Sequence, residues 1–246
     1  MAFHDDPPIR DHASLARFEA AMTLEQRLPE RSVLDVFIGA AARQPERIAI
    51  TMLMSGAADE QPRRINYAQL LGMVRRAANL FASVGGPRPG VAYMLPALVE
   101  THATLWGAET AGYAVPINFL LQVEHIAALL EASGARILVA LGPHPVLDIW
   151  QKALALHERM PGLTLIRVAP PGTPVEEGVI DFHAALAASR RSSWSSASRA
   201  KTTPWRPTFT PGAPPAHPGW WPTRTAGSWS PRSVARRWAA SVQTTC

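Results

Sequence analysis

The last 57 residues of this 246-residue chain, from Arg190 to Cys246, contain no Asp, Glu, Leu, Ile, Met, Asn or Tyr. Their only β-branched aliphatic residues are Val234 and Val242, whereas they hold six of the eight tryptophans and eight of the 23 prolines. A folded domain needs aliphatic residues in a periodic arrangement, because their burial offsets the entropy lost when the backbone is ordered. We therefore expect this segment to form no hydrophobic core and to be disordered.

Acidic residues are absent from the same segment. The first 189 residues carry 19 acidic and 15 basic residues, a net charge of −4, whereas the last 57 carry nine basic residues and no acidic one. The sequence pI of 10.1 therefore reflects the last segment alone. One interpretation is that this basic, Trp-containing segment binds nucleic acid or an anionic surface, since Lys and Arg neutralise phosphates and indole rings stack on bases.

Cysteine and long apolar runs are scarce. The single cysteine, Cys246, excludes an internal disulfide and a cysteine metal cluster, and as the last residue it does not fit a prenylation motif. The longest near-apolar stretch, residues 48–54, is too short to cross a bilayer, and residues 1–11 lack the apolar core of a secretory signal. We expect a cytoplasmic protein without a membrane span.

The first 189 residues alternate between helical and extended patterns. The apolar spacing predicts helices over 32–43, 66–81, 98–111, 124–133 and 149–159. It predicts strands over 47–53, 91–95, 114–117, 137–141 and 164–168. Such alternation is typical of an α/β fold with a largely parallel sheet. We expect an N-terminal extension over 1–31, a domain over 32–188, and the tail over 189–246.

Some helix ends can be predicted from local chemistry. Asn66 followed by Gln69 has the spacing of a capping box, in which each side chain accepts a hydrogen bond from the backbone of the other residue. Gly134 follows an apolar helical pattern and is expected to terminate it. In the helix that begins after Asn66, Arg75 and Arg76 are expected to face outward.

Candidate catalytic groups have simpler structural explanations. Gly85, Gly86 and Gly90 lie between a helix and a strand, whereas phosphate loops lie between a strand and a helix. Five histidines are scattered without ligand spacing: His102, His125, His144, His157 and His183. Two carboxylate pairs are better explained as solvated helix faces: Glu100 with Glu109, and Asp148 with Glu158. The sequence therefore assigns no catalytic, cofactor-binding or metal-binding residue.

A series of segments over residues 32–186 resembles the AMP-forming acyl-CoA synthetases of the adenylate-forming superfamily. Ile65-Asn66-Tyr67-Ala68-Gln69-Leu70 is similar to the "L-T-Y-x-E-L" helix start of that family. Further similar segments, with matching gaps, are 43–49, 75–82, 91–96, 105–112, 116–118, 125–130 and 133–140. The chain departs from the family where Gly90 runs directly into Val91 and where Ala97 replaces the usual Asn.

The resemblance implies an incomplete N-terminal AMP-binding-type domain over 32–188. The intact family joins a small-molecule carboxylate to CoA through an acyl-adenylate, using ATP and Mg²⁺, and binds ATP phosphates with a loop of the type "T-G-G-T-T-G-x-P-K". At the expected place this chain reads Thr208-Phe209-Thr210-Pro211-Gly212-Ala213-Pro214-Pro215-Ala216-His217-Pro218-Gly219. The resemblance thus implies that this chain itself holds no cofactor.

The codons of residues 201–227 permit the missing loop in another reading frame. When the third base of each codon is grouped with the first two of the next, the permitted residues include DDAVAAYFHTGGTTGTP, then Arg or Gly, then LVAHTHGG. The family's lysine is not permitted at that place. We therefore interpret the chain from about Ser189 onward as a frameshifted translation, caused by a lost or gained base near the codons for residues 189–198.

The expected function is that of an acyl-CoA synthetase fragment without activity, because the phosphate loop, later nucleotide-binding segments and small C-terminal domain of the family are not in the sequence. An alternative is a catalytically inactive partner of a complete synthetase. No partner is required, although uncovered apolar surface would favour self-association.

Overall fold

The computed structural model of the chain describes residues 8–23, 26, 30, 32–170 and 172–189. The chain divides into two units, Met1–Thr202 and Thr203–Cys246, and every described residue lies in the first. The predicted disorder of the tail, apart from Ser189, concerns residues outside the described part. Among the described residues, no helix combines the length and the apolar composition needed to cross a bilayer.

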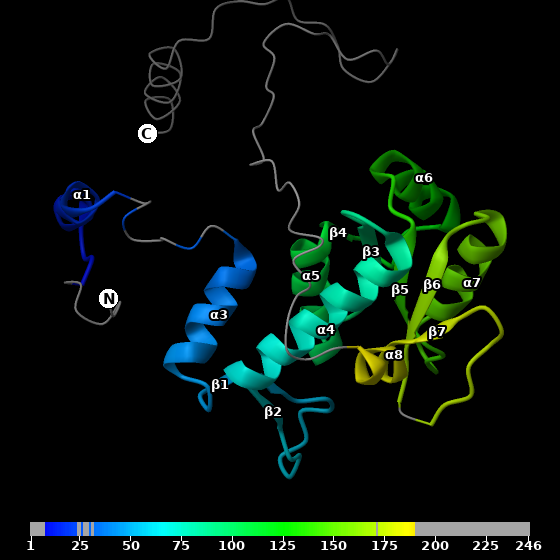
Figure 1. Cartoon of the computed structure of the whole chain (residues 1–246). Helices are drawn as coiled ribbons and strands as arrows, with labels where there is room; N and C mark the ends of the chain where they lie inside the picture. The colour runs from blue at the N-terminus through cyan, green and yellow to red at the C-terminus, as the bar shows by residue number, and fades with distance from the viewer. Residues whose placement is uncertain (1–7, 24–25, 27–29, 31, 171, 190–246) are drawn as a thin grey trace, which may run out of the picture. The chain divides into compact units, whose positions relative to one another are not determined.

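Helices and strands alternate along the described part of the chain (Figure 1). The helices are α1 (His12–Ala21), α3 (Val33–Arg43), α4 (Tyr67–Gly85), α5 (Val99–Ala111), α6 (Val123–Ser133), α7 (Ile149–Arg159) and α8 (Phe182–Ala188). The strands are β1 (Ile48–Met52), β2 (Arg63–Asn66), β3 (Gly90–Met94), β4 (Tyr113–Pro116), β5 (Ile137–Leu141), β6 (Thr164–Val168) and β7 (Ile180–Asp181). The predicted helices and strands are all present, whereas α1, β2, β7 and α8 were not predicted.

Five strands form one parallel sheet in the order β4-β3-β5-β6-β7. The chain enters the sheet at β3, adds β4 on one side, and then continues through β5, β6 and β7 on the other side. The predicted α/β class and the parallel pairing are thereby confirmed. β1 and β2 form a separate antiparallel ribbon, with a register shift between Ile48 and Ile50.

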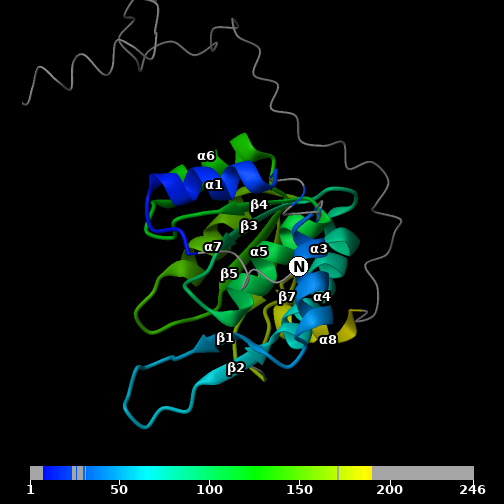
Figure 2. The same cartoon turned by 90° about the vertical axis from the view of Figure 1, so that its left-hand side faces the viewer.

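Helices cover both faces of the five-stranded sheet (Figures 1 and 2). On one face, α6 and α7 pack on Leu138 and Ala140 of β5 and on Leu165 of β6. On the other face, α4, α5 and α8 pack on Ile137 and Val139 of β5 and on neighbouring strands. Alternate residues of a strand point to opposite faces, so a strand buried on both sides is apolar throughout. This accounts for the uninterrupted apolar sequence of β5.

A third apolar cluster lies beside the sheet, where α3 and the β1–β2 ribbon pack on the first half of α4. Leu34 of α3, Ile65 of β2, and Leu70 and Val74 of α4 are buried in it. The ring of Phe37 lies 5.5 Å from that of Trp106, which ties α3 to α5. This cluster fixes the ribbon against the helical layer.

The capping box predicted at the start of α4 is present. The Asn66 side chain accepts a hydrogen bond from the Gln69 backbone N–H at 2.8 Å, and the Gln69 side chain accepts one from the Asn66 N–H at 2.9 Å. Further along α4, Arg75 and Arg76 are half-buried rather than fully outward. Long arginine stems lie along apolar surface even when their charged ends reach toward water, which explains the difference.

Candidate functional site

The carboxyl ends of β3 and β5 lie at the point where the direction of strand addition reverses. β3 leads through α5 to β4 on one side, and β5 leads through α7 to β6 on the other. Because the two connections leave on opposite faces of the sheet, they open a crevice between them, and ligands of parallel α/β sheets bind in such crevices. The carboxyl edge of the sheet is therefore the first place to look for a site.

A cavity of about 590 Å³ lies at this edge, within the size range of small-molecule pockets. We name it the carboxyl-edge pocket. Five separate segments contribute its lining: Met54 and Arg63; Leu98 and Glu100; Leu141, Gly142, Pro143, His144 and Pro145; Val168, Ala169 and Pro170; and His183. Figures 1 and 2 both show the β1–β2 ribbon and α8 at the same end of the sheet. The pocket thus depends on the whole domain rather than on one loop.

A buried carboxylate forms part of the pocket wall. The Glu100 side chain is 6% exposed and accepts a hydrogen bond from Arg63 Nη1 at 2.8 Å. His183 Nε2 lies 3.9 Å from the same carboxylate oxygen. Glu100 also lies in the first turn of α5, where the helix dipole favours negative charge. The Arg63–Glu100 pair fastens the β1–β2 ribbon to the start of α5.

The loop of the β1–β2 ribbon is held by its own carboxylate. Glu60 accepts hydrogen bonds from the backbone N–H groups of Met54, Ser55 and Gly56, and from the Ser55 hydroxyl. The hydrogen bond from the Met54 N–H, with the others, lowers the pKa of Glu60 to about 2. Glu60 therefore remains ionised at physiological pH and fixes the turn that presents Met54 to the pocket.

The contacts of His144 indicate the tautomer of its neutral ring. His144 Nδ1 accepts hydrogen bonds from the backbone N–H groups of Val146 and Leu147, each at 3.2 Å. A neutral imidazole that accepts at Nδ1 carries its proton on Nε2. His144 is exposed and lines the pocket, so it supplies an N–H donor at that end of the sheet.

The segment that follows β6 is anchored by Arg167, whose side chain is 1% exposed. Arg167 donates to the carbonyl of Thr173 at 2.9 Å, to the carbonyl of Pro174, and to Glu176 at 3.0 Å. A Cβ added at Gly142 would lie only 3.2 Å from the Arg167 stem and 3.0 Å from Ala169, so a larger residue there would require these side chains to shift. Arg167 thus holds the segment after β6, whose first residues line the pocket, against the strand.

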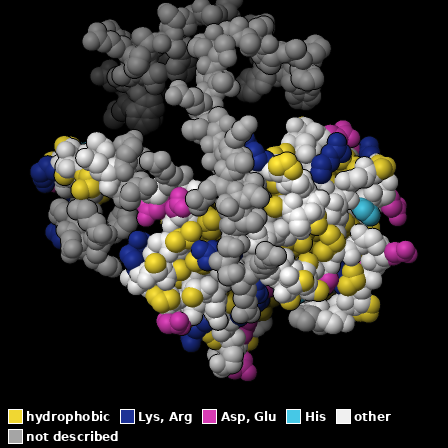
Figure 3. Space-filling view, viewed as in Figure 1, with side chains coloured by type: hydrophobic (Ala, Val, Ile, Leu, Met, Phe, Trp, Pro, Cys, Tyr) yellow, Lys and Arg dark blue, Asp and Glu magenta, His cyan; other side chains and the backbone are white. Residues whose placement is uncertain are grey.

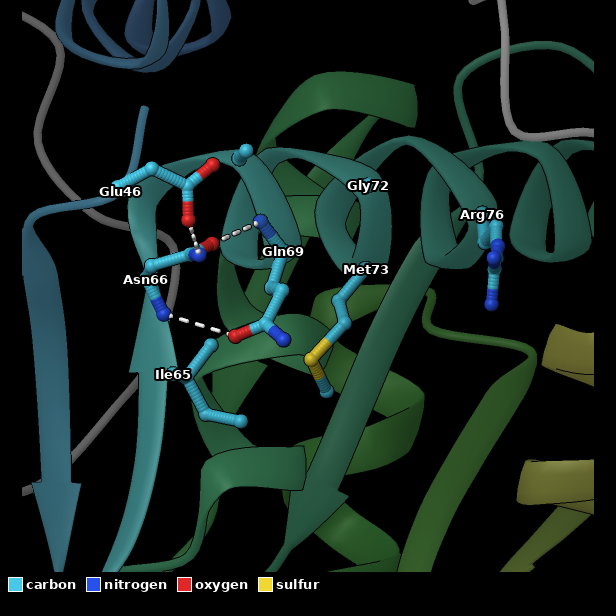
Figure 4. A pocket seen from close by; sticks show the side chains of 8 residues that line it. Glu46, Ile65, Asn66, Gln69, Gly72, Met73 and Arg76 are labelled. Carbon is cyan, nitrogen blue, oxygen red and sulfur yellow. Dashed lines mark hydrogen bonds between the residues drawn. The ribbon is translucent and has the colours of Figure 1, made fainter. Parts of the chain in front are cut away.

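A second cavity of about 540 Å³ lies along α4. Figure 4 shows Gln69, Met73 and Arg76 along the helix, with Glu46 and Asn66 at its start. The Asn66 amide donates to Glu46 at 2.9 Å in addition to its part in the capping box. Glu46, Asn66 and Gln69 hydrogen-bond one another in fastening the start of α4. The buried Nε of Arg76 has no hydrogen-bond partner among the described residues.

The glycines considered in the sequence lie where a helix meets a strand. Gly85 ends α4, Gly86 follows it with φ +72°, and Gly90 begins β3. A Cβ on Gly90 would collide with the ring of Tyr113, whose hydroxyl donates to the Ser133 carbonyl at 2.8 Å. Close packing and a helix end account for these glycines.

The two carboxylate pairs are not brought together. Glu100 and Glu109 lie at opposite ends of α5, and Glu109 accepts from the Ala114 N–H at 3.4 Å. Asp148 precedes α7 and pairs with Lys152 at 3.1 Å, whereas Glu158 is exposed at the other end of that helix.

The five histidines divide into two groups. His102 and His125 are exposed, and His157 Nδ1 lies 2.8 Å from the Leu163 carbonyl oxygen. His144 and His183, by contrast, both line the carboxyl-edge pocket. In the described part of the chain, no group of three His, Cys, Asp or Glu residues has the arrangement of a metal site.

Arg63 is a charged pocket residue that the sequence analysis did not single out. It lies in a short strand with two arginines, and nothing in the local pattern indicates a partner 37 residues away. Residues that follow β3 and β5 must meet at one edge of a parallel sheet, a signal that applies to Glu100 and His144 but not to Arg63 in β2.

The described residues do not provide a phosphate loop. The connection after β3 contains Pro96, and the connection after β5 contains Pro143 and Pro145. Proline has no backbone N–H, and phosphate cradles are built from successive backbone N–H groups. The prolines therefore reduce the number of backbone N–H groups that this edge can offer to a phosphate.

Comparison with known proteins identifies the family. A family model described as AMP-binding enzyme matches residues 37–221. The marinolic acid–CoA ligase of Pseudoalteromonas sp. (strain SANK 73390) is 33% identical over 187 residues, which cover 75% of this chain and 28% of that protein. The chain therefore spans less than a third of that relative.

Solved structures agree in fold. An acyl-CoA synthetase of Brucella canis matches with a TM-score of 0.53 and 22% identity, over 78% of this chain and 33% of that chain. A benzoate CoA ligase of Burkholderia xenovorans LB400 matches with a TM-score of 0.52 and 19% identity, over 66% of this chain and 29% of that chain. On the family match, the chain belongs to the AMP-binding enzymes, and its described part has the fold of their N-terminal portion.

Proposed function

We propose that the described domain is the opening portion of an ATP-dependent acyl-CoA ligase. In the complete protein, a carboxylate would attack the α-phosphate of ATP, releasing pyrophosphate, and the thiol of CoA would then displace AMP from the acyl-adenylate. The observation that carries this proposal is the family match over residues 37–221, supported by a 33%-identical relative that is a CoA ligase.

We further propose that the 246-residue polypeptide does not itself adenylate a carboxylate. Phosphoryl transfer depends on backbone donors and cations fixed around the moving charge, and loss of one such donor raises the barrier by about 3 kcal/mol. The prolines beside the carboxyl-edge pocket leave few backbone N–H groups for a phosphate there. Residues 208–219 hold four prolines where the family has its glycine- and threonine-rich loop.

A frameshift accounts for the sequence of residues 208–219. The regrouped codons of residues 201–227 permit a threonine- and glycine-rich loop, and the family match ends at residue 221, inside the same segment. The absence of acidic residues after Arg190 has the same explanation, because a non-coding frame is not constrained to encode a soluble, folded surface.

Restoring the frame tests the proposal. We expect the source gene, with one base inserted or deleted in the codons for residues 189–198, to encode a protein that releases pyrophosphate from ATP only when a carboxylic acid is present. The 246-residue chain should release none above the rate without protein. The matched control is the restored gene with its threonine–glycine loop replaced by alanines, which should be as inactive as the original chain.

Two results would contradict the proposal. Carboxylate-dependent pyrophosphate release by the unmodified chain would show that the in-frame segment is competent. The second is a result of sequencing the source DNA directly. An open frame for residues 190–246, with no continuation in the regrouped frame, would contradict the frameshift.

A further inference from the structure

We propose that the cavity along α4 is a contact surface for a second copy of this chain, with Gly72 of both copies at a two-fold axis and each Arg76 paired with the partner's Glu46. We name this cavity the α4 groove; it runs from Glu46, at the start of the helix, past Gly72 to Arg76 (Figure 4). Ala68 and Gln69 in its lining are exposed, so the groove opens to solvent. The inference goes beyond the proposed function and does not depend on adenylation.

One end of the α4 groove carries a cation without an acceptor. The Nε atom of Arg76 is buried and has no hydrogen-bond partner among the described residues. The ion pairs of the described domain do not include this side chain. A guanidinium has five N–H donors, and a buried donor that makes no hydrogen bond is destabilising. An acceptor from outside the described domain would remove that cost.

The other end of the groove carries an anion. Glu46 is exposed, and its Oε2 accepts a hydrogen bond from the Asn66 amide at 2.9 Å. No described residue donates to its second oxygen, Oε1. Asn66 and Arg76 are ten residues apart along α4, a distance of about 15 Å at the rise of an α-helix. The groove therefore presents opposite charges at its two ends.

Gly72 lies between these two charges. Glycine inside a helix is less favourable than alanine, so its presence there calls for a reason. A Cβ added at Gly72 would meet no atom within 4 Å, whereas a Cβ added at Gly107 of α5 would lie 2.5 Å from Ala77. Packing within the domain thus explains Gly107 but not Gly72. A glycine permits another backbone to approach closely, which gives Gly72 a role at a contact between chains.

A second copy of this chain fits the groove because its charges match by symmetry. In a two-fold contact, a residue that touches another receives the same contact in return. If two α4 helices cross antiparallel near Gly72, each Arg76 faces the partner's Glu46, and both pairs form at once. A small ligand would instead need opposite charges about 15 Å apart. The spacing of the charges therefore favours a second copy.

The test is disulfide crosslinking at the proposed axis, in the full chain with Cys246→Ser, which removes its single cysteine. Two Gly72→Cys residues at a two-fold axis would lie within the Cα–Cα range of a disulfide, about 4.4–6.8 Å. With oxidised glutathione, we expect Gly72→Cys to form a linked dimer about tenfold faster than Leu120→Cys, because thiols held together react at a high effective concentration. Leu120 is the matched control, since it is 71% exposed and does not line the groove.

Charge exchange tests the pairing. In the Gly72→Cys chain, Arg76→Glu or Glu46→Arg alone places like charges across the contact and should slow crosslinking to the rate of Leu120→Cys. Both changes together restore opposite charges and should restore the fast rate. Glu46→Arg also removes the hydrogen bond to Asn66, and so does the combined exchange. Restoration therefore separates charge pairing from damage to the start of α4.

Arg75→Glu is the matched control for charge, because Arg75 is half-buried like Arg76 but does not line the groove. It should leave the crosslinking rate of Gly72→Cys unchanged. Three outcomes would overturn the proposal: Gly72→Cys that links no faster than Leu120→Cys, a combined exchange that stays slow, or an equal loss in Arg75→Glu and Arg76→Glu.

Discussion

Arg167 is the least expected residue of the core. It is a strand residue on the face that packs against α7, its side chain is 1% exposed, and its guanidinium lies 5.9 Å from the centre of the Trp150 ring. Burial of a cation is costly unless oxygen atoms surround it. Here the carbonyls of Thr173 and Pro174 and the carboxylates of Glu176 and Asp181 do so, at 3.9 Å in the case of Asp181.

We expect Arg167→Ala to lower the free energy of unfolding by about 3 kcal/mol, because it removes the cation that holds the loop after β6 and leaves buried acceptors unpaired. Urea unfolding followed by tryptophan fluorescence measures the change. Arg159→Ala is the control: that side chain is 55% exposed, with a carboxylate 4.0 Å away, and should contribute less than about 0.5 kcal/mol. Equal losses in the two variants would contradict a special role for Arg167.

Individual pocket residues were only partly predictable from the sequence. Glu100, His144 and His183 were considered, but each was paired with the wrong neighbours or with none. Their meeting depends on long-range strand order, which local spacing does not contain. Arg63 was not considered, because a charged residue in a short exposed strand has no local signature of a buried partner.

Helix α4 begins with a reciprocal capping box. We expect Asn66→Ala to lower the free energy of unfolding by about 1 kcal/mol, because the N–H of Gln69 and the N–H of residue 66 lose their reciprocal arrangement. Chemical unfolding of the purified chain measures the loss.

Gln122 is the matched control for that variant, since it occupies the same position before α6 but makes no side-chain cap hydrogen bond. Gln122→Ala should leave the stability within about 0.5 kcal/mol. A larger loss there than at Asn66 would show that capping does not decide the stability of these helix starts.

Whole elements were predicted where their apolar pattern is strong. Ile137–Leu141 and Thr164–Val168 are strands at the predicted residues, because fully buried parallel strands are apolar on both faces. β7 has only two residues, and β2 carries two arginines, so neither has a pattern to detect. No residue of α1 is buried, and its start is marked by a capping box formed by Asp11 and Ser14.

The described domain leaves apolar side chains at its surface, some of them visible in yellow between charged groups in Figure 3. Leu53 is 53% exposed, Met54 71% and Val146 83%, and all three lie at or next to the carboxyl-edge pocket. Exposed apolar side chains of this kind favour association.

We expect the chain to sediment as a concentration-dependent mixture, and Leu53→Ser with Met54→Ser to shift it toward the monomer. Sedimentation velocity over a range of concentrations measures the shift. Leu120→Ser, at a residue 71% exposed that is not part of the pocket lining, is the control and should have a smaller effect. A monomeric original chain at all concentrations would contradict this prediction.

The order in which strands join the sheet has a consequence for synthesis. From β4 onward, every strand pairs with one that the ribosome has already released: β4 and β5 with β3, β6 with β5, and β7 with β6. Domains fold during translation at about 5–20 residues per second, so the 57 residues after Ser189 occupy the ribosome for roughly 3–11 s. All the pairing partners of the sheet have therefore been translated before that segment is. A change of reading frame beyond Ser189 therefore leaves unchanged the sequence of every pairing strand and the order in which the strands are translated.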